Sequence, residues 1–128
     1  QNIFEMTSEE ILADGCMQMG HAIKLIAPGH EGAQRGQRFA VGIRSEEVVI
    51  IRPNKPLGPE LQENLFHAKV VDILAFGGTH TLCVKLQKSE VTIDVELPNC
   101  AMRDLGYTIG NDLQICLRKR SLWTIPLN

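Results

Sequence analysis

The sequence has little of what marks redox, membrane and nucleic-acid proteins. Its four cysteines, Cys16, Cys83, Cys100 and Cys116, form no Cys-x-x-C pair, which excludes the usual zinc-ribbon and thioredoxin-like motifs. Aromatic residues make up only 5% of the chain and the formal net charge is −2. A nucleic-acid platform needs stacking aromatics and a basic surface. No apolar run reaches the roughly 18 residues of a membrane-spanning helix.

Signatures of catalysis and metal binding are also absent from the sequence. There is no G-x-x-x-x-G-K-[ST] phosphate-binding loop, so these residues alone are not expected to hydrolyse ATP. The four histidines, His21, His30, His67 and His80, lack the spacing of metal ligands. We therefore predict no catalytic residues and no metal site, and reduced, packed cysteines.

Short segments in which apolar and polar residues alternate recur along the chain. The clearest are residues 39–43, 82–86, 91–97 and 113–117, and a period of two is typical of half-buried β-strands. The longest strand is expected at residues 64–76, an apolar, β-branched run that ends at Gly77-Gly78. Because turn signals separate the segments, the pattern predicts an all-β barrel or sandwich.

Three local assignments complete this prediction. Residues 7–10 have the spacing of a helix capping box, but Asp14-Gly15 follows so soon that a polar loop is preferred. Residues 16–26 are expected to be strand-like. Asn99 is expected to cap one short helix that ends before Gly106.

The chain contains an internal repeat. The pattern N-[IL]-F begins at Asn2 and again at Asn64, 62 residues later, and residues 39–51 align with residues 113–125 at an offset of 74. One copy alone would be too small to bury a good core. We expect a pseudo-twofold pair of half-barrels that share strands. The repeats would be residues 1–52 and 64–128, joined by a Pro-rich linker at 53–63.

These motifs resemble the TOBE domain, an OB-like accessory domain at the C-terminus of ATP-binding subunits of ABC importers, and the related molybdate-binding Mop domains. The resemblance rests on both N-[IL]-F segments, on N-L-F-H-A-K-V-V at 64–71, V-G-I-R-S-E-E-V at 41–48 and L-G-Y-T-I-G at 105–110. It implies an all-β fold of two OB-like half-barrels with one short helix. The sequence departs from the family pattern at Met6 and Ala68, where glycine is usual, and at Leu61, where Mop proteins have serine.

The resemblance also implies a binding site for a tetrahedral oxyanion. Lys69, Arg118 and Ser121 match the lysine, the basic residue and the Ser/Thr that Mop-type sites place near the anion. A doubly charged oxyanion needs several N–H and O–H donors and a nearby cation. The alternative is a surface lysine and a solvated arginine at a strand end, with no ligand.

The corresponding corner of the first half contains Arg44, Glu46 and Glu47. The resemblance implies that this corner contacts the ATPase domain or its dimer mate. A charged turn that caps a strand is the alternative.

The function implied is that of a C-terminal regulatory and dimerisation domain of an importer ATP-binding subunit. Its solute would be molybdate, tungstate or sulfate, which the domain would also sense. The partners would be the ATPase domain of the same chain and its dimer mate, in a homodimer without nucleic acid. ATP and Mg²⁺ would bind that missing domain, upstream of Gln1, and no cofactor is expected here. The protein would be cytoplasmic and peripheral to the inner membrane, which it would meet only through the permease.

Other functions stay open at this point. The chain could be a free-standing Mop-like oxyanion-binding protein, or the regulatory domain of a sugar, polyamine or ferric-iron importer. An OB-type nucleic-acid binder is the third possibility, for which residues 118–120 supply the one basic cluster.

Overall fold

The alternating segments form ten β-strands in the computed structural model, which describes residues 2–127. The strands are β1 (Asn2–Ile11), β2 (Met17–Gly20), β3 (Lys24–Ala27), β4 (Arg38–Ile43), β5 (Val49–Ile50), β6 (Leu65–Phe76), β7 (Thr79–Leu86), β8 (Thr92–Pro98), β9 (Asp112–Cys116) and β10 (Trp123–Pro126). One α-helix, α1 (Asn99–Leu105), and three 3-10 turns, η1 (Ser45–Glu47), η2 (Pro59–Leu61) and η3 (Lys119–Ser121), lie between them. The predicted all-β class with one short helix is confirmed.

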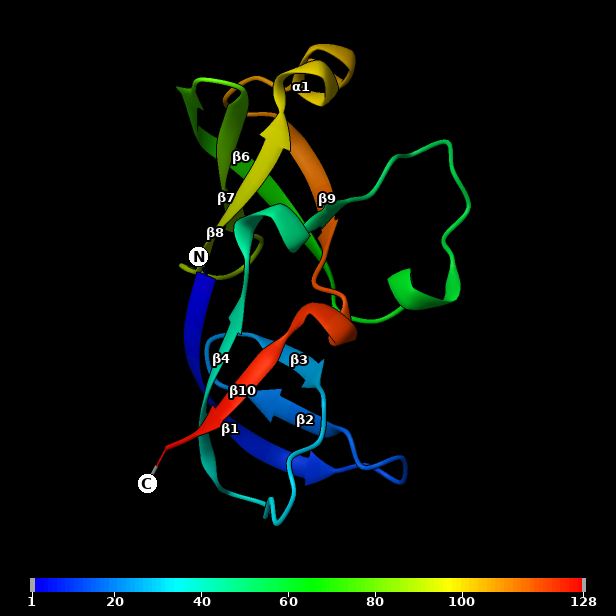
Figure 1. Cartoon of the computed structure of the whole chain (residues 1–128), viewed down its shortest axis with the longest axis vertical. Coiled ribbons are helices and arrows are strands. Elements are labelled where there is room, and N and C mark those ends of the chain that lie inside the picture. Colours follow the sequence, from blue (N-terminus) through cyan, green and yellow to red (C-terminus); the bar gives the residue numbers. More distant parts are fainter. Residues whose placement is uncertain (1, 128) are drawn as a thin grey trace.

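The strands form two antiparallel five-stranded sheets, which lie one above the other in Figure 1. The strand orders are β10-β4-β1-β2-β3 and β5-β9-β6-β7-β8. Strand β10, red in Figure 1, runs beside β4 in the lower half although it ends the chain. Strand β5 makes the reverse crossing and pairs with β9. The two OB-like halves therefore share strands, as the repeat predicts, and the sheets do not divide at residues 53–63.

The two exchanged strands make the same contact twice. Val49 lies opposite Cys116, and Trp123 lies opposite Gly42. The repeat offset of 74 residues relates Val49 to Trp123 and Gly42 to Cys116, so the two pairs are equivalent. Gly42 is required by this crossing, because a Cβ at that position would lie 2.0 Å from Cζ2 of Trp123. The indole ring thus covers the backbone of β4 where the two halves interlock.

The two repeated asparagines tie each half to the other. The Asn2 side chain donates to the Asp94 carbonyl (3.0 Å) and accepts from its N–H (2.8 Å). The Asn64 side chain accepts from the N–H of Ile26 (2.7 Å) and donates to the carbonyls of Ile26 (2.8 Å) and Leu117 (2.9 Å). Asn64 also has a φ of 56°, a left-handed conformation that asparagine tolerates better than most residues. The asparagine of each N-[IL]-F motif therefore lies where its own half is hydrogen-bonded to the other half.

One continuous core fills both halves. It takes the inward-facing residues of the alternating segments, such as Phe39, Val41 and Ile43 in β4 and Leu82 and Val84 in β7, all fully buried. Within residues 2–127, no helix has the length and apolarity needed to cross a membrane.

One local prediction in the first half is wrong, and another is incomplete. Residues 7–10 are not a loop, because they continue β1 and pair with β2, with a bulge between Ser8 and Glu10. The Ser8 hydroxyl is buried, donates to the Gln34 carbonyl and accepts from the Gln37 N–H (3.0 Å), so tertiary contacts override the capping signal. Residues 16–26 are strand-like as predicted, but a turn at 21–23 divides them into the hairpin β2–β3.

The helix is where the sequence predicts it, with a different cap. Pro98 occupies the N-cap position, and Asn99 is the first helical residue. The Asn99 side chain instead donates to the Gly77 carbonyl (3.0 Å) and lies 2.7 Å from Nδ1 of His80. Gly106 ends the helix in the left-handed conformation, with a φ of 65°. The outermost residues of the expected repeats, Gln1 and Asn128, lie outside the described residues.

Candidate anion-binding sites

Two of the three predicted site residues, Arg118 and Ser121, meet at the corner where the halves cross. Arg118 caps the 3-10 turn η3, and Ser121 is its last residue. Both donate to the same atom, Oε2 of Glu47, from 3.2 Å (Arg118 Nη2) and 3.0 Å (Ser121 Oγ). Among the described residues, Arg118 Nε is buried without any hydrogen-bond partner. We call Glu47, Arg118 and Ser121 the corner site.

The corner site already holds an anion, the carboxylate of Glu47. A guanidinium and a hydroxyl that converge on one oxygen offer the donors that an oxyanion would need. Arg118 is the more enclosed partner, with 22% of its side chain exposed against 43% for Glu47. An external oxyanion that uses these donors therefore has to displace the Glu47 side chain toward solvent.

The corner site brings together residues that occupy equivalent positions in the two repeats. Glu47 and Ser121 occupy the same position of the two repeats, 74 residues apart, and so do Arg44 and Arg118. Turn η1 contacts β8 of the upper half, and turn η3 contacts β3 of the lower half. From the sequence, Glu47 is predicted at a separate interface and not beside Ser121. The repeat offset of 74 residues, which relates Glu47 to Ser121, is the sequence signal that could link the two residues.

The remaining residues of the first corner, Arg44 and Glu46, pair with each other. Arg44 Nη2 lies 2.8 Å from Glu46 Oε2, and both side chains are about half exposed or more, at 67% and 46%. They border a hollow that Leu74, Asp94 and Glu96 line from the upper half. In this chain, Arg44 and Glu46 therefore lie beside the second half of the same molecule.

The third predicted site residue, Lys69, is not near the corner site. The β6–β9 ladder begins with Leu65 opposite Cys116 and ends with Lys69 opposite Asp112. Arg118 lies beyond the first end of this ladder and Lys69 is at the other end. At about 3.3 Å per residue they are separated by roughly 13 Å or more along the strand. The structure thus divides the predicted residues between two places.

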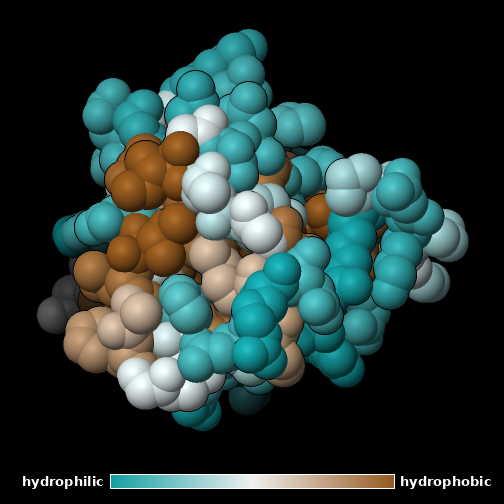
Figure 2. Space-filling model, turned by 90° about the horizontal axis from the view of Figure 1, so that it is seen from above, coloured by the Kyte–Doolittle hydropathy of each residue, from teal (hydrophilic) through white to brown (hydrophobic). Residues whose placement is uncertain are grey.

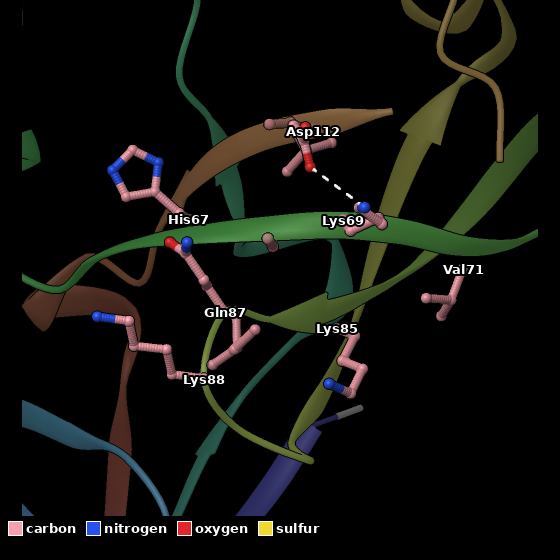
Figure 3. A pocket seen from close by; sticks show the side chains of 10 residues that line it. His67, Lys69, Val71, Lys85, Gln87, Lys88 and Asp112 are labelled. Atoms are coloured by element: carbon pink, nitrogen blue, oxygen red, sulfur yellow. Dashed lines mark ion pairs between the residues drawn. The ribbon is translucent and has the colours of Figure 1, made fainter. Parts of the chain in front are cut away.

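Lys69 lines a hollow on the outer surface of the upper half (Figure 3). The hollow has a volume of about 540 Å³ and is lined by His67, Ala68, Lys69, Val71, Lys85, Leu86, Gln87, Lys88, Asp112 and Leu113. The polar side chains come from β6, from the end of β7 with its turn, and from the start of β9. We call this surface the lysine hollow.

The part of the chain that the structure describes shows no comparable arrangement for a metal or a reactive thiol. Among residues 2–127, no group of three or more His, Cys, Asp or Glu side chains is placed to hold a metal ion. The four cysteines are free thiols. Burial raises the pKa of the Cys83 and Cys116 thiols, which disfavours the reactive thiolate.

Comparisons with known proteins support the fold assignment. No protein-family model matches the sequence, and no curated protein matches it either. Among solved structures, the chain is similar to the cytoplasmic molybdate-binding protein ModG in a form with molybdate bound, with a TM-score of 0.79 and 14% sequence identity. The similarity covers 97% of this chain and 94% of that chain. At this low identity it shows that the two proteins share their fold, a pair of OB-like halves of Mop type.

Proposed function

We propose that this chain is an oxyanion-binding domain of the Mop type. The observation that carries the proposal is the fold shared with molybdate-bound ModG over 97% of the chain. The convergence of Arg118 and Ser121 on one carboxylate oxygen supports it, because those donors suit a tetrahedral anion. Binding, rather than catalysis, is the activity proposed, and the ligands are molybdate, tungstate or sulfate.

The corner site is the place proposed for the anion. The ligand takes the hydrogen bonds of Arg118 and Ser121 as the Glu47 carboxylate rotates into solvent, where 43% of that side chain is already exposed. The buried Arg118 Nε supplies one further donor. Lys69 has no direct part in this site, because it lies at the far end of the β6–β9 ladder.

Two biological settings fit an oxyanion-binding domain. In the first, which the V-G-I-R-S-E-E-V motif suggests, the domain regulates the ATP-binding subunit of an ABC importer at the cytoplasmic side of the membrane. A ligand that binds one state of that subunit better shifts its population. In the second, the chain acts as a separate cytoplasmic binding protein, a setting that the fold shared with ModG also fits. Reading the gene upstream of Gln1 separates them, because a phosphate-binding loop there selects the importer.

Calorimetric titration with molybdate, tungstate and sulfate tests the binding function. We expect saturable binding of at least one anion and a loss of about tenfold or more in Arg118→Ala, because a hydrogen bond to a charged group contributes about 1.5–3 kcal/mol. Arg44→Ala is the matched control, since Arg44 is the repeat equivalent of Arg118 and pairs only with Glu46 among the described residues. Absence of heat with all three anions at millimolar concentration and folded protein would overturn the proposal.

We also propose that the protein is a homodimer, with the outer edge of β6 as the contact. Beyond Val70, which still bonds the 110–111 turn, residues 71–76 make no backbone hydrogen bond on that edge within residues 2–127. Val71, Leu74 and Phe76 are exposed there, and the segment contains no lysine or proline, which often protect free edges. Figure 2, viewed from this end, shows hydrophobic surface gathered on one side. Two copies can pair this edge antiparallel about a twofold axis.

A further inference from the structure

The lysine hollow contains an unusual pair of like charges. Lys69 of β6 lies directly opposite Lys85 of β7 in the antiparallel ladder. The next row on this face is His67 and Gln87, which are joined by the bond from the Gln87 N–H to the His67 carbonyl (2.8 Å). Residues that alternate along a strand share one face, so these four side chains lie on the same outer surface. Like charges directly opposite each other in a sheet are destabilising, and here nothing in the core requires them.

Neighbouring carboxylates neutralise this pair only weakly. Lys69 Nζ is 4.0 Å from Asp112 Oδ1, drawn dashed in Figure 3, and Lys85 Nζ is 3.8 Å from Glu90 Oε1. The two carboxylate side chains are 85% and 97% exposed, and ion pairs so exposed to water contribute little. Both lysines are therefore free to turn from these carboxylates toward a bound anion.

A third lysine completes the positive rim. Lys88 lies in the turn after β7 and lines the same hollow. Among residues 2–127 it has no acidic partner within 4.0 Å, whereas Lys69 and Lys85 each have one. Its backbone is held in the left-handed conformation, with a φ of 61°. Three lysines against Asp112 give the lining a formal charge of +2, or +1 with Glu90 beside Lys85 included, in a chain whose net charge is −2.

The size of the hollow argues for more than one anionic group. Its volume of about 540 Å³ lies in the range of small-molecule sites, roughly 300–1,000 Å³. Val71, which is 41% exposed, contributes apolar surface beside the lysines, which suits the body of an organic ligand. One tetrahedral oxyanion could reach only part of a rim that extends across two strands and a turn.

We propose that the lysine hollow binds a small molecule carrying two or more phosphate-type groups. One group is bound by Lys69 and Lys85 as they turn from Asp112 and Glu90, and the second is reached by Lys88. Gln87 and His67 offer side-chain donors on the same surface. This second site is independent of the oxyanion proposed for the corner. A nucleic-acid strand fits less well, because no Phe, Tyr or Trp lines the hollow for base stacking.

Pyrophosphate is the probe for this site, measured by calorimetry and by amide chemical shifts at low ionic strength. We expect one saturable site, with shifts centred on residues 67–71, 85–88 and 112–113. Lys85→Gln with Lys88→Gln should weaken binding about tenfold or more, since charge-assisted hydrogen bonds are lost. Asp112→Asn should strengthen it, because the competing carboxylate is removed.

The controls separate a built site from general attraction between charges. Lys24→Gln with Lys55→Gln removes the same two charges from exposed positions elsewhere and should leave the affinity within about twofold. Arg118→Ala should also leave it unchanged, which distinguishes this site from the corner site. Any of four results overturns the proposal: no binding at millimolar pyrophosphate, equal losses in the control pair, equally tight binding of orthophosphate, or tighter binding of a single-stranded oligonucleotide.

Discussion

Removing the charge of Glu47 should increase the affinity of the corner site for an oxyanion. The Glu47 carboxylate accepts hydrogen bonds from Arg118 and Ser121 at 3.2 and 3.0 Å. An anion that takes these donors must therefore compete with it. The substitution Glu47→Gln keeps the size of the side chain and its carbonyl oxygen but removes the negative charge.

The expected magnitude is the repulsion between the bound anion and the displaced carboxylate. Two unit charges at an assumed separation of about 4 Å repel by about 1 kcal/mol in water. The repulsion energy for water applies because 43% of the Glu47 side chain is exposed. For a dianion the repulsion is about 2 kcal/mol, which corresponds to a factor of about 30 in Kd.

The assay is calorimetric titration of Glu47→Gln and the natural sequence with molybdate, tungstate and sulfate at one ionic strength. Glu46→Gln is the matched control, because Glu46 neighbours Glu47 in η1 and pairs with Arg44 instead. We expect tighter binding in Glu47→Gln and no more than a twofold change in Glu46→Gln. Equal affinities in the natural sequence and Glu47→Gln, or a gain of the same size in both variants, would refute the idea that Glu47 occupies the anion's place.

Three further predictions concern packing, assembly and thiol chemistry. Gly42→Ala should lower the free energy of unfolding by about 1–3 kcal/mol in denaturant titrations, because its Cβ would overlap the Trp123 ring; an unchanged midpoint would contradict this packing. In sedimentation, Phe76→Lys should shift the protein toward monomer, whereas Ile3→Lys, at a similarly exposed apolar residue outside the β6 edge, should not; a natural sequence that is already monomeric would disprove the proposed dimer. Cys100 should react first with a thiol reagent, since the other three cysteines are half-buried or buried; faster modification of any other cysteine would count against this.

Much of the fold was predictable because its signals are local or repeated. The alternation in residues 82–86 and 91–97 predicts two strands, which the structure shows paired as β7 and β8. The run at 64–76 becomes β6, since β-branched residues bounded by glycines favour a strand. Repetition of residues 39–51 at 113–125 predicted shared strands, because a half too small for its own core must borrow from its neighbour.

Where prediction failed, a distant partner outweighed a local preference. The capping-box spacing at residues 7–10 favours a helix start or a polar loop, yet buried Ser8 and the ladder with β2 keep this segment in β1. Asn99 has the chemistry of a helix cap, but its amide is engaged by Gly77 and His80 across the β7–β8 pair. Neither partner is visible in the sequence near these residues.

The sequence by itself determined the strand pattern, the duplication and the residue types that can bind an anion, because each depends only on composition and on the spacing of residues along the chain. Only the tertiary structure decided which of those residues meet. It placed Glu47 between Arg118 and Ser121 and put Lys69 at the other end of the β6–β9 ladder, opposite Lys85. The physical reason is that the strand exchange and the register of antiparallel pairing set distances between residues far apart in the chain, and a one-residue change in register would reassign every cross-strand neighbour.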